Sequence, residues 1–318
     1  SSGGLPMPLH PQAADALEKA AAMGFPSATD VTPEEARANA RISRSAIGAE
    51  VEPVGSVEDS SFPGPAGEVP IRIYRPDEDE GHPLVMLFHG GGWVIGDLDA
   101  EDTTARGTCS RVNAVVVSVD YRLAPEIRFP GAVEDCYAAT KWAIDNSDSL
   151  GIDGSRVATT GTSAGGNLSG AVSMMARDLG GPHISHQVLF CPVIDFDFDR
   201  KSYIECAEGY GLTREAMILY WNQYTGTGED RSNPYAALIR ASDLSGLPDA
   251  TIIAAQYDPL VDEAVAYGDA LKAAGVDTLS VVYDGMTHGF NNRTGIIDAA
   301  KEAMDQSAQR ILRSFGDV

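Results

Sequence analysis

The chain has 318 residues, of which 43% are hydrophobic and 22% are charged. It can therefore bury a sizeable core, and its composition excludes a disordered, collagen-like or coiled-coil protein. Twenty-three Lys and Arg against 46 Asp and Glu give a formal net charge of −23. Because such a surface repels phosphate backbones and anionic headgroups, we expect no nucleic acid and no membrane partner.

The first 50 residues predict two helices. Pro11 to Met23 is rich in alanine, and Thr32 before Pro33 supplies a cap and a first-turn proline for a second helix that ends near Gly48. Ser1–Gly4 has no signal-peptide pattern and is expected to be the remnant of an expression tag. A trimmed leader stays open, so a cytoplasmic location is only the default expectation.

From Val69 onward, short apolar runs alternate with segments of helical period. The predicted strands are 69–75, 84–88, 114–119, 157–160, 187–190, 251–255 and 279–283. The predicted helices are 99–112, 131–147, 164–178, 261–274 and 298–314. Strands that alternate with helices predict an α/β fold with a doubly wound, mostly parallel sheet.

One stretch, from Asp195 to about Asp230, interrupts this alternation. It is rich in aromatic residues, namely Phe196, Phe198, Tyr203, Tyr210, Tyr220, Trp221 and Tyr224. Long insertions are usually functional, and with the N-terminal helices this one could form a cap over the carboxyl edge of the sheet. A helix pair that simply packs on the core is an equal alternative. The expected organisation is cap helices in 1–50, core in 51–194, a cap insertion in 195–230 and core again in 231–318.

The strongest local motif is Gly161-Thr-Ser-Ala-Gly165, directly between a predicted strand and a predicted helix. A strand that turns at once into a helix crowds its neighbours, so small residues must stand two before and two after the exposed Ser163. A phosphate loop is excluded because Asn167 stands where that loop needs lysine. A plain tight turn remains the alternative.

A glycine run, His89-Gly-Gly-Gly-Trp93, follows the predicted strand 84–88. A dinucleotide fingerprint fails because residue 95 is Ile. Consecutive glycines at a strand end let backbone N–H groups face a cavity, where they stabilise a developing oxyanion. Gly91 and Gly92, with the N–H of Ala164, are the expected oxyanion donors.

A nucleophilic serine needs an acid and a histidine, and in this strand–turn–helix context they follow it in that order. His288 is the only histidine after residue 186 and follows a predicted strand. Among the acids, Asp258 lies at a strand end, whereas Asp262 and Glu263 fall in the first turn of a helix, where the helix dipole explains them. We therefore predict Asp258 as the orienting acid.

Metal and membrane chemistry find no support in the sequence. The cysteines at 109, 136, 191 and 206 form no C-x-x-C, and with six scattered histidines they show no zinc spacing. We expect buried, reduced thiols and no metal site. No apolar run reaches the roughly 20 residues that a membrane helix needs.

Together these motifs resemble the hormone-sensitive-lipase-like branch of the α/β-hydrolases, the microbial carboxylesterases, from about Val69 to His288. The resemblance rests on HGGGW at 89–93, YRLAPE at 121–126, the Gly161–Leu168 turn, DPL at 258–260 and HGF at 288–290. Two departures are Thr162, where many members carry Asp, and Ile127, where His is frequent.

The resemblance implies an α/β-hydrolase fold with a helical cap and a serine carboxylesterase for short-chain esters. It assigns Ser163 as nucleophile, His288 as base, Asp258 as orienter, and Gly91, Gly92 and Ala164 as the oxyanion hole. It implies no cofactor and a homodimer, and it suggests that Arg122 pairs with Glu126. A ligand receptor, a lyase or dehydratase, and a hydrolase of amides, lactones or carbamates stay open as alternatives.

Overall fold

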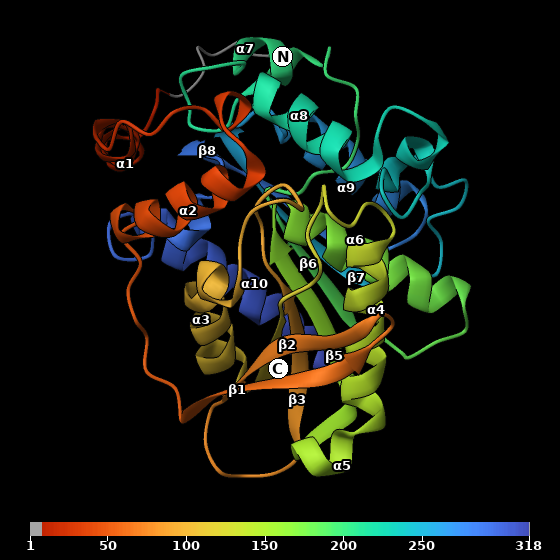
Figure 1. Cartoon of the computed structure of the whole chain (residues 1–318). Helices are drawn as coiled ribbons and strands as arrows, with labels where there is room; N and C mark the ends of the chain where they lie inside the picture. The colour runs from red at the N-terminus through yellow and green to blue at the C-terminus, as the bar shows by residue number, and fades with distance from the viewer. Residues whose placement is uncertain (1–7, 318) are drawn as a thin grey trace.

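A single eight-stranded sheet forms the centre of the computed structural model, which describes residues 8–317 (Figure 1). The expected tag residues lie outside this range. The strands are β1 (Ser56–Gly64), β2 (Gly67–Arg75), β3 (His82–Phe88), β4 (Val115–Val119), β5 (Ile152–Thr162), β6 (His186–Phe190), β7 (Asp249–Tyr257) and β8 (Thr278–Thr287). Their order is β1-β2-β4-β3-β5-β6-β7-β8, and from β4 onward the pairs are parallel. The predicted doubly wound, mostly parallel sheet is confirmed.

Ten α-helices surround this sheet within the described residues. They are α1 (Pro11–Ala22), α2 (Pro33–Ser43), α3 (Asp102–Val112), α4 (Gly131–Asp145), α5 (Ser147–Leu150), α6 (Ala164–Asp178), α7 (Lys201–Glu205), α8 (Arg214–Thr225), α9 (Val261–Ala273) and α10 (Asp298–Phe315). Thr32 caps α2 in a capping box with Glu35, as its sequence position predicts.

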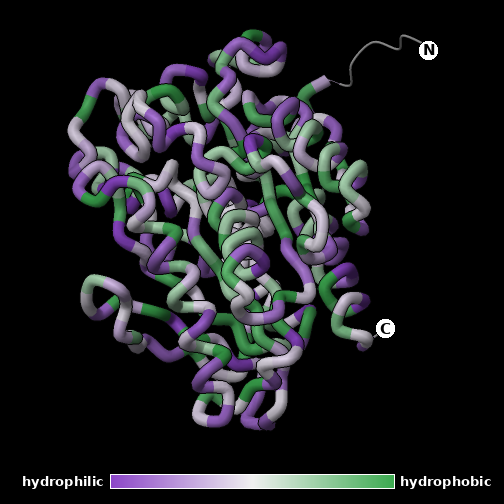
Figure 2. Tube along the Cα trace, turned by 90° about the vertical axis from the view of Figure 1, so that its right-hand side faces the viewer, coloured by the Kyte–Doolittle hydropathy of each residue, from purple (hydrophilic) through white to green (hydrophobic). Residues whose placement is uncertain are grey.

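The central strands are buried on both faces, which explains their unbroken apolar runs. In β3, Leu84, Met86 and Phe88 join one core with residues of α4, α6 and α9. Val85 and Leu87 point to the opposite core, which α3 and α10 cover. Figure 2 shows the hydrophobic strands running through the middle of the molecule.

Strand β1 is the element that the sequence does not reveal. Its residues are nearly all exposed, and only Phe62 is buried. An exposed edge strand needs no apolar alternation, so its polar sequence carries no strand signal. It forms instead because β1 pairs antiparallel with β2 along its whole length.

Four helices, α1, α2, α7 and α8, gather at the upper end of the molecule in Figure 1. From α2, Arg37 reaches the core, where it donates hydrogen bonds to the carbonyl oxygens of Val94 and Ala124. From α8, Tyr224 stacks on Trp93 with ring centroids 4.1 Å apart.

The expected ion pair between Arg122 and Glu126 is wrong. Arg122 donates to the buried Asp135 of α4 at 2.9 Å, and Glu126 pairs with Arg37 of α2 at 2.8 Å. A spacing of four residues brings side chains together on a helix, but this segment is not helical. Each residue therefore pairs with the helix on its own side.

Among residues 8–317, no helix is long and apolar enough to cross a membrane. The four cysteines are free and buried, as expected.

Candidate active site

Ser163 occupies a sharp turn between β5 and α6. Its backbone has φ 61° and ψ −116°, which is strained for a residue with a side chain. Two backbone hydrogen bonds to β6 and the segment after it hold this turn: the Ser163 N–H donates to the Phe190 carbonyl at 2.8 Å, and the Ser163 carbonyl accepts from the Val193 N–H at 3.2 Å. The strain is therefore fixed by the surrounding fold.

The glycines on either side of Ser163 are sterically required. A Cβ on Gly161 would lie 2.3 Å from the Gly165 carbonyl oxygen, and a Cβ on Gly165 would lie 1.9 Å from the Phe88 carbonyl oxygen. Both approaches are far inside van der Waals contact. The turn accepts only glycine at these positions, which is stricter than the small residues that the motif requires.

Asp258 and His288 come from the ends of the adjacent strands β7 and β8. The Nδ1–H of His288 donates to Asp258 Oδ2 at 2.7 Å. Asp258 is 1% exposed, and its other oxygen accepts from the Leu260 N–H at 2.9 Å. Both carboxylate oxygens are thus held, and the imidazole is fixed through Nδ1.

The two competing acids point elsewhere. Asp262 accepts from the N–H of Ser202 in α7 at 2.9 Å. Glu263 is fully buried and accepts from the N–H groups of Ile194 and Asp195, so it is no surface charge at a helix dipole. Of the three acids, Asp258 is the one that meets His288.

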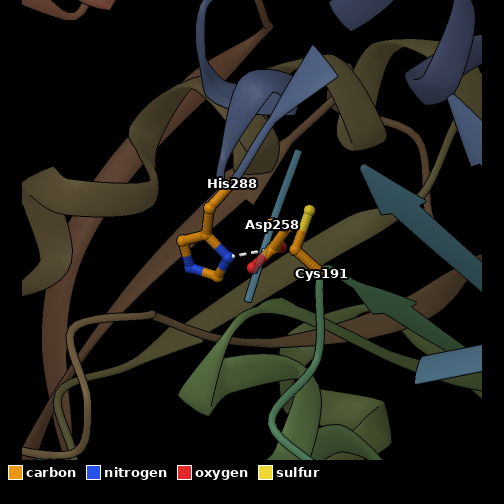
Figure 3. A group of neighbouring side chains, drawn as sticks. All are labelled: Cys191, Asp258 and His288. Atoms are coloured by element: carbon orange, nitrogen blue, oxygen red, sulfur yellow. Dashed lines mark hydrogen bonds and ion pairs between the residues drawn. The ribbon is translucent and has the colours of Figure 1, made fainter. Parts of the chain in front are cut away.

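Cys191 lies beside this pair (Figure 3), and donor atoms of Cys191, Asp258 and His288 lie within 4.8 Å of one another. These residue types can ligate a metal, but burial raises the pKa of the Cys191 thiol well above its usual range. Metal ligation needs the thiolate. His288 Nδ1 and Asp258 Oδ2 are also already joined by a hydrogen bond, so the geometry fits an acid–imidazole pair better than a metal site.

A pocket of about 280 Å³ brings the predicted residues together. Its lining includes Ser163 and His288 from the sheet edge and Gly91 and Gly92 from the loop after β3. The rest of the lining comprises Ala40, Arg44, Ile47, Gly90, Ile95, Gly96, Ala100, Glu101, Thr162, Leu212, Met217, Tyr220, Gly289 and Asn292. Ala164 is buried at the first position of α6, and its side chain is not part of the lining.

Gly91 and Gly92 have conformations that favour glycine, with φ +120° and +59°. A Cβ on Gly91 would lie 2.0 Å from the Ile95 carbonyl oxygen, and one on Gly92 would lie 2.4 Å from the Tyr220 ring. Their N–H groups have no hydrogen-bond acceptor within residues 8–317. Two unused donors therefore sit in the wall of the pocket.

His89 supports this loop from behind. Its Nδ1–H donates to the Gly90 carbonyl at 2.7 Å, and its ring stacks on the ring of Tyr121 with the centroids 4.2 Å apart. Burial lowers the pKa of His89 to about 4, so the imidazole is neutral near pH 7. Tyr121 also donates to the His89 carbonyl at 2.6 Å, which ties the YRLAPE segment to the glycine loop.

The aromatic insertion divides between core and pocket. Tyr220 lines the pocket, whereas Trp221 and Tyr224 are fully buried against Trp93. Sequence reasoning did not single out Glu101, whose carboxyl lies at the pocket, or the place of Cys191 beside Asp258. Neither residue lies in a motif, and both approach from distant parts of the chain, so no local signal marks them.

Comparison with known proteins places this geometry in a family. A family described as alpha/beta hydrolase fold matches residues 85–292. The esterase LipI of Mycobacterium tuberculosis is 41% identical over 262 residues, which are 80% of this chain and 81% of that protein. An arylesterase of Saccharolobus solfataricus is 42% identical over 240 residues, or 75% of this chain and 78% of that protein.

Solved structures agree over nearly the full length. The hyperthermophilic esterase of the archaeon Pyrobaculum calidifontis superposes with a TM-score of 0.91 at 39% identity, covering 98% of this chain and 100% of that one. The chain belongs to the α/β-hydrolase family and is an esterase of its hormone-sensitive-lipase-like branch.

Proposed function

We propose that this esterase hydrolyses short-chain carboxylic esters by acyl transfer to Ser163, with His288 as the base and Asp258 as the acid that orients it. The hydrogen bond from His288 Nδ1 to Asp258, at the pocket that Ser163 also lines, carries the proposal. Similar proteins that are named esterases support ester hydrolysis as the reaction.

The proton path follows from the tautomer. Because Asp258 is a carboxylate acceptor, Nδ1 of His288 carries the proton and Nε2 has a free lone pair. Nε2 then takes the proton from the Ser163 hydroxyl as its oxygen attacks the ester carbonyl. Asp258 stabilises the resulting imidazolium, which returns the proton to the departing alcohol.

The oxyanion is stabilised by backbone donors. The N–H groups of Gly91 and Gly92 line the pocket without another acceptor, and the N–H of Ala164 belongs to the start of α6, where a helix leaves such donors unpaired. The three donors bind the negative oxygen of the tetrahedral intermediate. Water then repeats the attack on the acyl-enzyme.

The size of the pocket supports short acyl chains. Its volume of about 280 Å³ lies just below the roughly 300–1,000 Å³ that is usual for small-molecule sites. We assign residues 1–50 and 195–230 as the cap that closes it, with Tyr220 as the bulky ring. Specificity then peaks at acyl chains of about two to six carbons and falls by tenfold or more by about C12, a difference of about 1.4 kcal/mol.

The test is a series of p-nitrophenyl esters from C2 to C12 at saturating and limiting substrate. Multiple turnovers with a maximum between C2 and C6 support the proposal. Binding without turnover would instead indicate a receptor, and specificity that rises through C12 would indicate a lipase. The homodimer stays a prediction, which sedimentation equilibrium tests.

A further inference from the structure

Glu101 is an acidic residue that the mechanism above does not use. It ends the short helix Leu98–Glu101 and directly precedes α3. It is 2% exposed, yet it lines the pocket. A buried carboxyl so close to the reacting groups calls for a physical reason, because burial of an acid is costly.

The carboxyl does not serve its own helix. Glu101 occupies the cap position of α3, but its side chain caps no backbone N–H of the first turn. Instead, Glu101 Oε1 accepts from the N–H of Gly90 at 3.2 Å. Its carboxyl therefore binds the backbone of the glycine loop and does not cap the backbone of the helix that follows it.

The rest of its surroundings is polar but incompletely paired. Thr104, Thr162 and Asn292 lie close enough to lower the pKa of Glu101, while burial dominates and raises it to about 7. Oε2 is buried and has no hydrogen-bond partner among the described residues. One carboxyl oxygen thus binds the glycine loop while the other is buried without a partner, which is costly.

Gly90 is the point at which this bond can act on the reaction. The two residues after it, Gly91 and Gly92, carry the proposed oxyanion donors, and their glycine backbones have wide conformational freedom. His89 donates to the Gly90 carbonyl and so holds the peptide between Gly90 and Gly91. Glu101 accepts from the Gly90 N–H and so holds the preceding peptide, between His89 and Gly90.

We propose that Glu101 is a positioning residue, whose Oε1 fixes the Gly90 peptide and thereby aims the N–H groups of Gly91 and Gly92 at the oxyanion. This inference rests on the proposed acyl transfer at Ser163. Because the donors act on the transition state, the effect falls on kcat more than on KM.

Three substitutions separate the parts of this role. Glu101→Gln keeps an acceptor at the same reach, so kcat stays within about threefold of wild type. Glu101→Leu removes the acceptor at similar size, and Glu101→Asp withdraws it by one methylene. Both lower kcat for p-nitrophenyl butyrate by about 10- to 100-fold, with KM within about threefold, as expected when the buried Gly90 N–H is left without an acceptor.

The matched control is Glu263→Leu, because Glu263 is also fully buried and also accepts from backbone N–H groups, but does not line the pocket. It lowers the melting temperature and leaves kcat within about threefold. Affinity for a trifluoromethyl ketone, which forms an oxyanion on the serine, weakens in Glu101→Leu in parallel with kcat and stays at the wild-type value in Glu263→Leu.

Three results would overturn the role of Glu101: wild-type kcat in folded Glu101→Leu, wild-type kcat in Glu101→Asp, or a loss in Glu101→Gln as large as in Glu101→Leu. If Glu101→Leu does not fold, the Gln and Asp variants decide. Ser163→Ala separates a failure of the proposed function from a failure of this inference. Activity that survives in Ser163→Ala refutes the proposed function. An inactive Ser163→Ala together with an unaffected Glu101→Asp refutes only the role of Glu101.

Discussion

The pocket has two walls of different construction. The sheet side combines the backbone of the glycine loop after β3, where Gly91 leaves no room for a Cβ, with Ser163 and His288 at strand ends. The cap side consists of side chains, among them Ile47 before β1 and Leu212, Met217 and Tyr220 in or near α8. Backbone donors cannot be exchanged by substitution, whereas side chains can.

This difference suggests a division of labour. Groups whose positions decide the reaction rate stand on the sheet side, where steric constraint fixes them to the precision that catalysis requires. Groups that set the size of the substrate stand on the cap side, where a change of ring or chain alters volume without moving the reacting atoms. Substitutions on the two sides should therefore change different kinetic constants.

The largest effect is expected on the sheet side, at Ser163. Ser163→Ala removes the nucleophile and should abolish ester turnover, with a loss of about 10⁶-fold as in a comparable hydrolase triad. The melting temperature should change little, because the hydroxyl makes no hydrogen bond within residues 8–317. Purified protein that keeps more than about a tenth of wild-type kcat would contradict the assignment.

The next effect distinguishes two neighbouring acids. Asp258→Asn should lower kcat by about 10⁴-fold, because an amide holds His288 in the wrong tautomer. Asp262→Asn is the control, since Asp262 contacts Ser202 of α7 and belongs to the attachment of the cap. The opposite ranking in steady-state assays would move the orienting role to Asp262.

A third substitution lies where the walls meet. Gly92→Ala puts a Cβ against the Tyr220 ring and displaces an oxyanion donor, so we expect a loss in kcat of about 10²-fold. Adding Tyr220→Ala to Gly92→Ala removes the clash and should restore part of kcat, while the positive φ at Gly92 keeps some strain. A double variant no better than Gly92→Ala would show that the two walls are not in contact in this way.

On the cap side, Tyr220→Ala should widen the pocket. We expect kcat/KM for a C10 or C12 ester to rise about tenfold relative to C4, with kcat for C4 little changed. Tyr210→Ala is the matched control, because this tyrosine of the same segment stacks on Tyr257 at 5.0 Å and does not line the pocket. Equal chain-length profiles in the two variants would remove Tyr220 as the size limit.

The smallest effect concerns Glu263, which holds the start of the insertion at Ile194 and Asp195. Burial raises the pKa of Glu263 from 4.5 to about 8. The folded state therefore binds this proton more tightly than the unfolded state, so the stability it contributes is complete below about pH 4.5 and is lost as the pH rises to about 8.

Glu263→Gln stays neutral and should lose less stability over that range. The difference in melting temperature, variant minus wild type, should grow from pH 4.5 to pH 8 in calorimetric scans. If the melting temperatures of variant and wild type changed in parallel with pH, Glu263 would have the same pKa in the folded and unfolded states.

Sequence reasoning succeeds where local structure and burial act together. The runs of β3 and β4 are apolar because both faces are covered. Ser163, Asp258 and His288 each follow a strand, so the parallel sheet brings them to one edge.

The features that sequence reasoning misses depend on partners that only the folded chain brings near. Exposed β1 carries no pattern, and Glu101 reaches the pocket from a segment without a motif. The expected pair of Arg122 and Glu126 is wrong, because in the folded chain Arg122 binds Asp135 of α4 and Glu126 binds Arg37 of α2.

The most direct test of the central claim is covalent labelling by diethyl p-nitrophenyl phosphate, followed by mass spectrometry of the digested protein. The account predicts one diethylphosphoryl group per active chain, attached to Ser163, with loss of esterase activity in proportion to labelling. Protein with Asp258→Asn should label far more slowly, because its imidazole no longer activates the serine. A label on another residue, or activity that survives complete labelling of Ser163, would contradict the account.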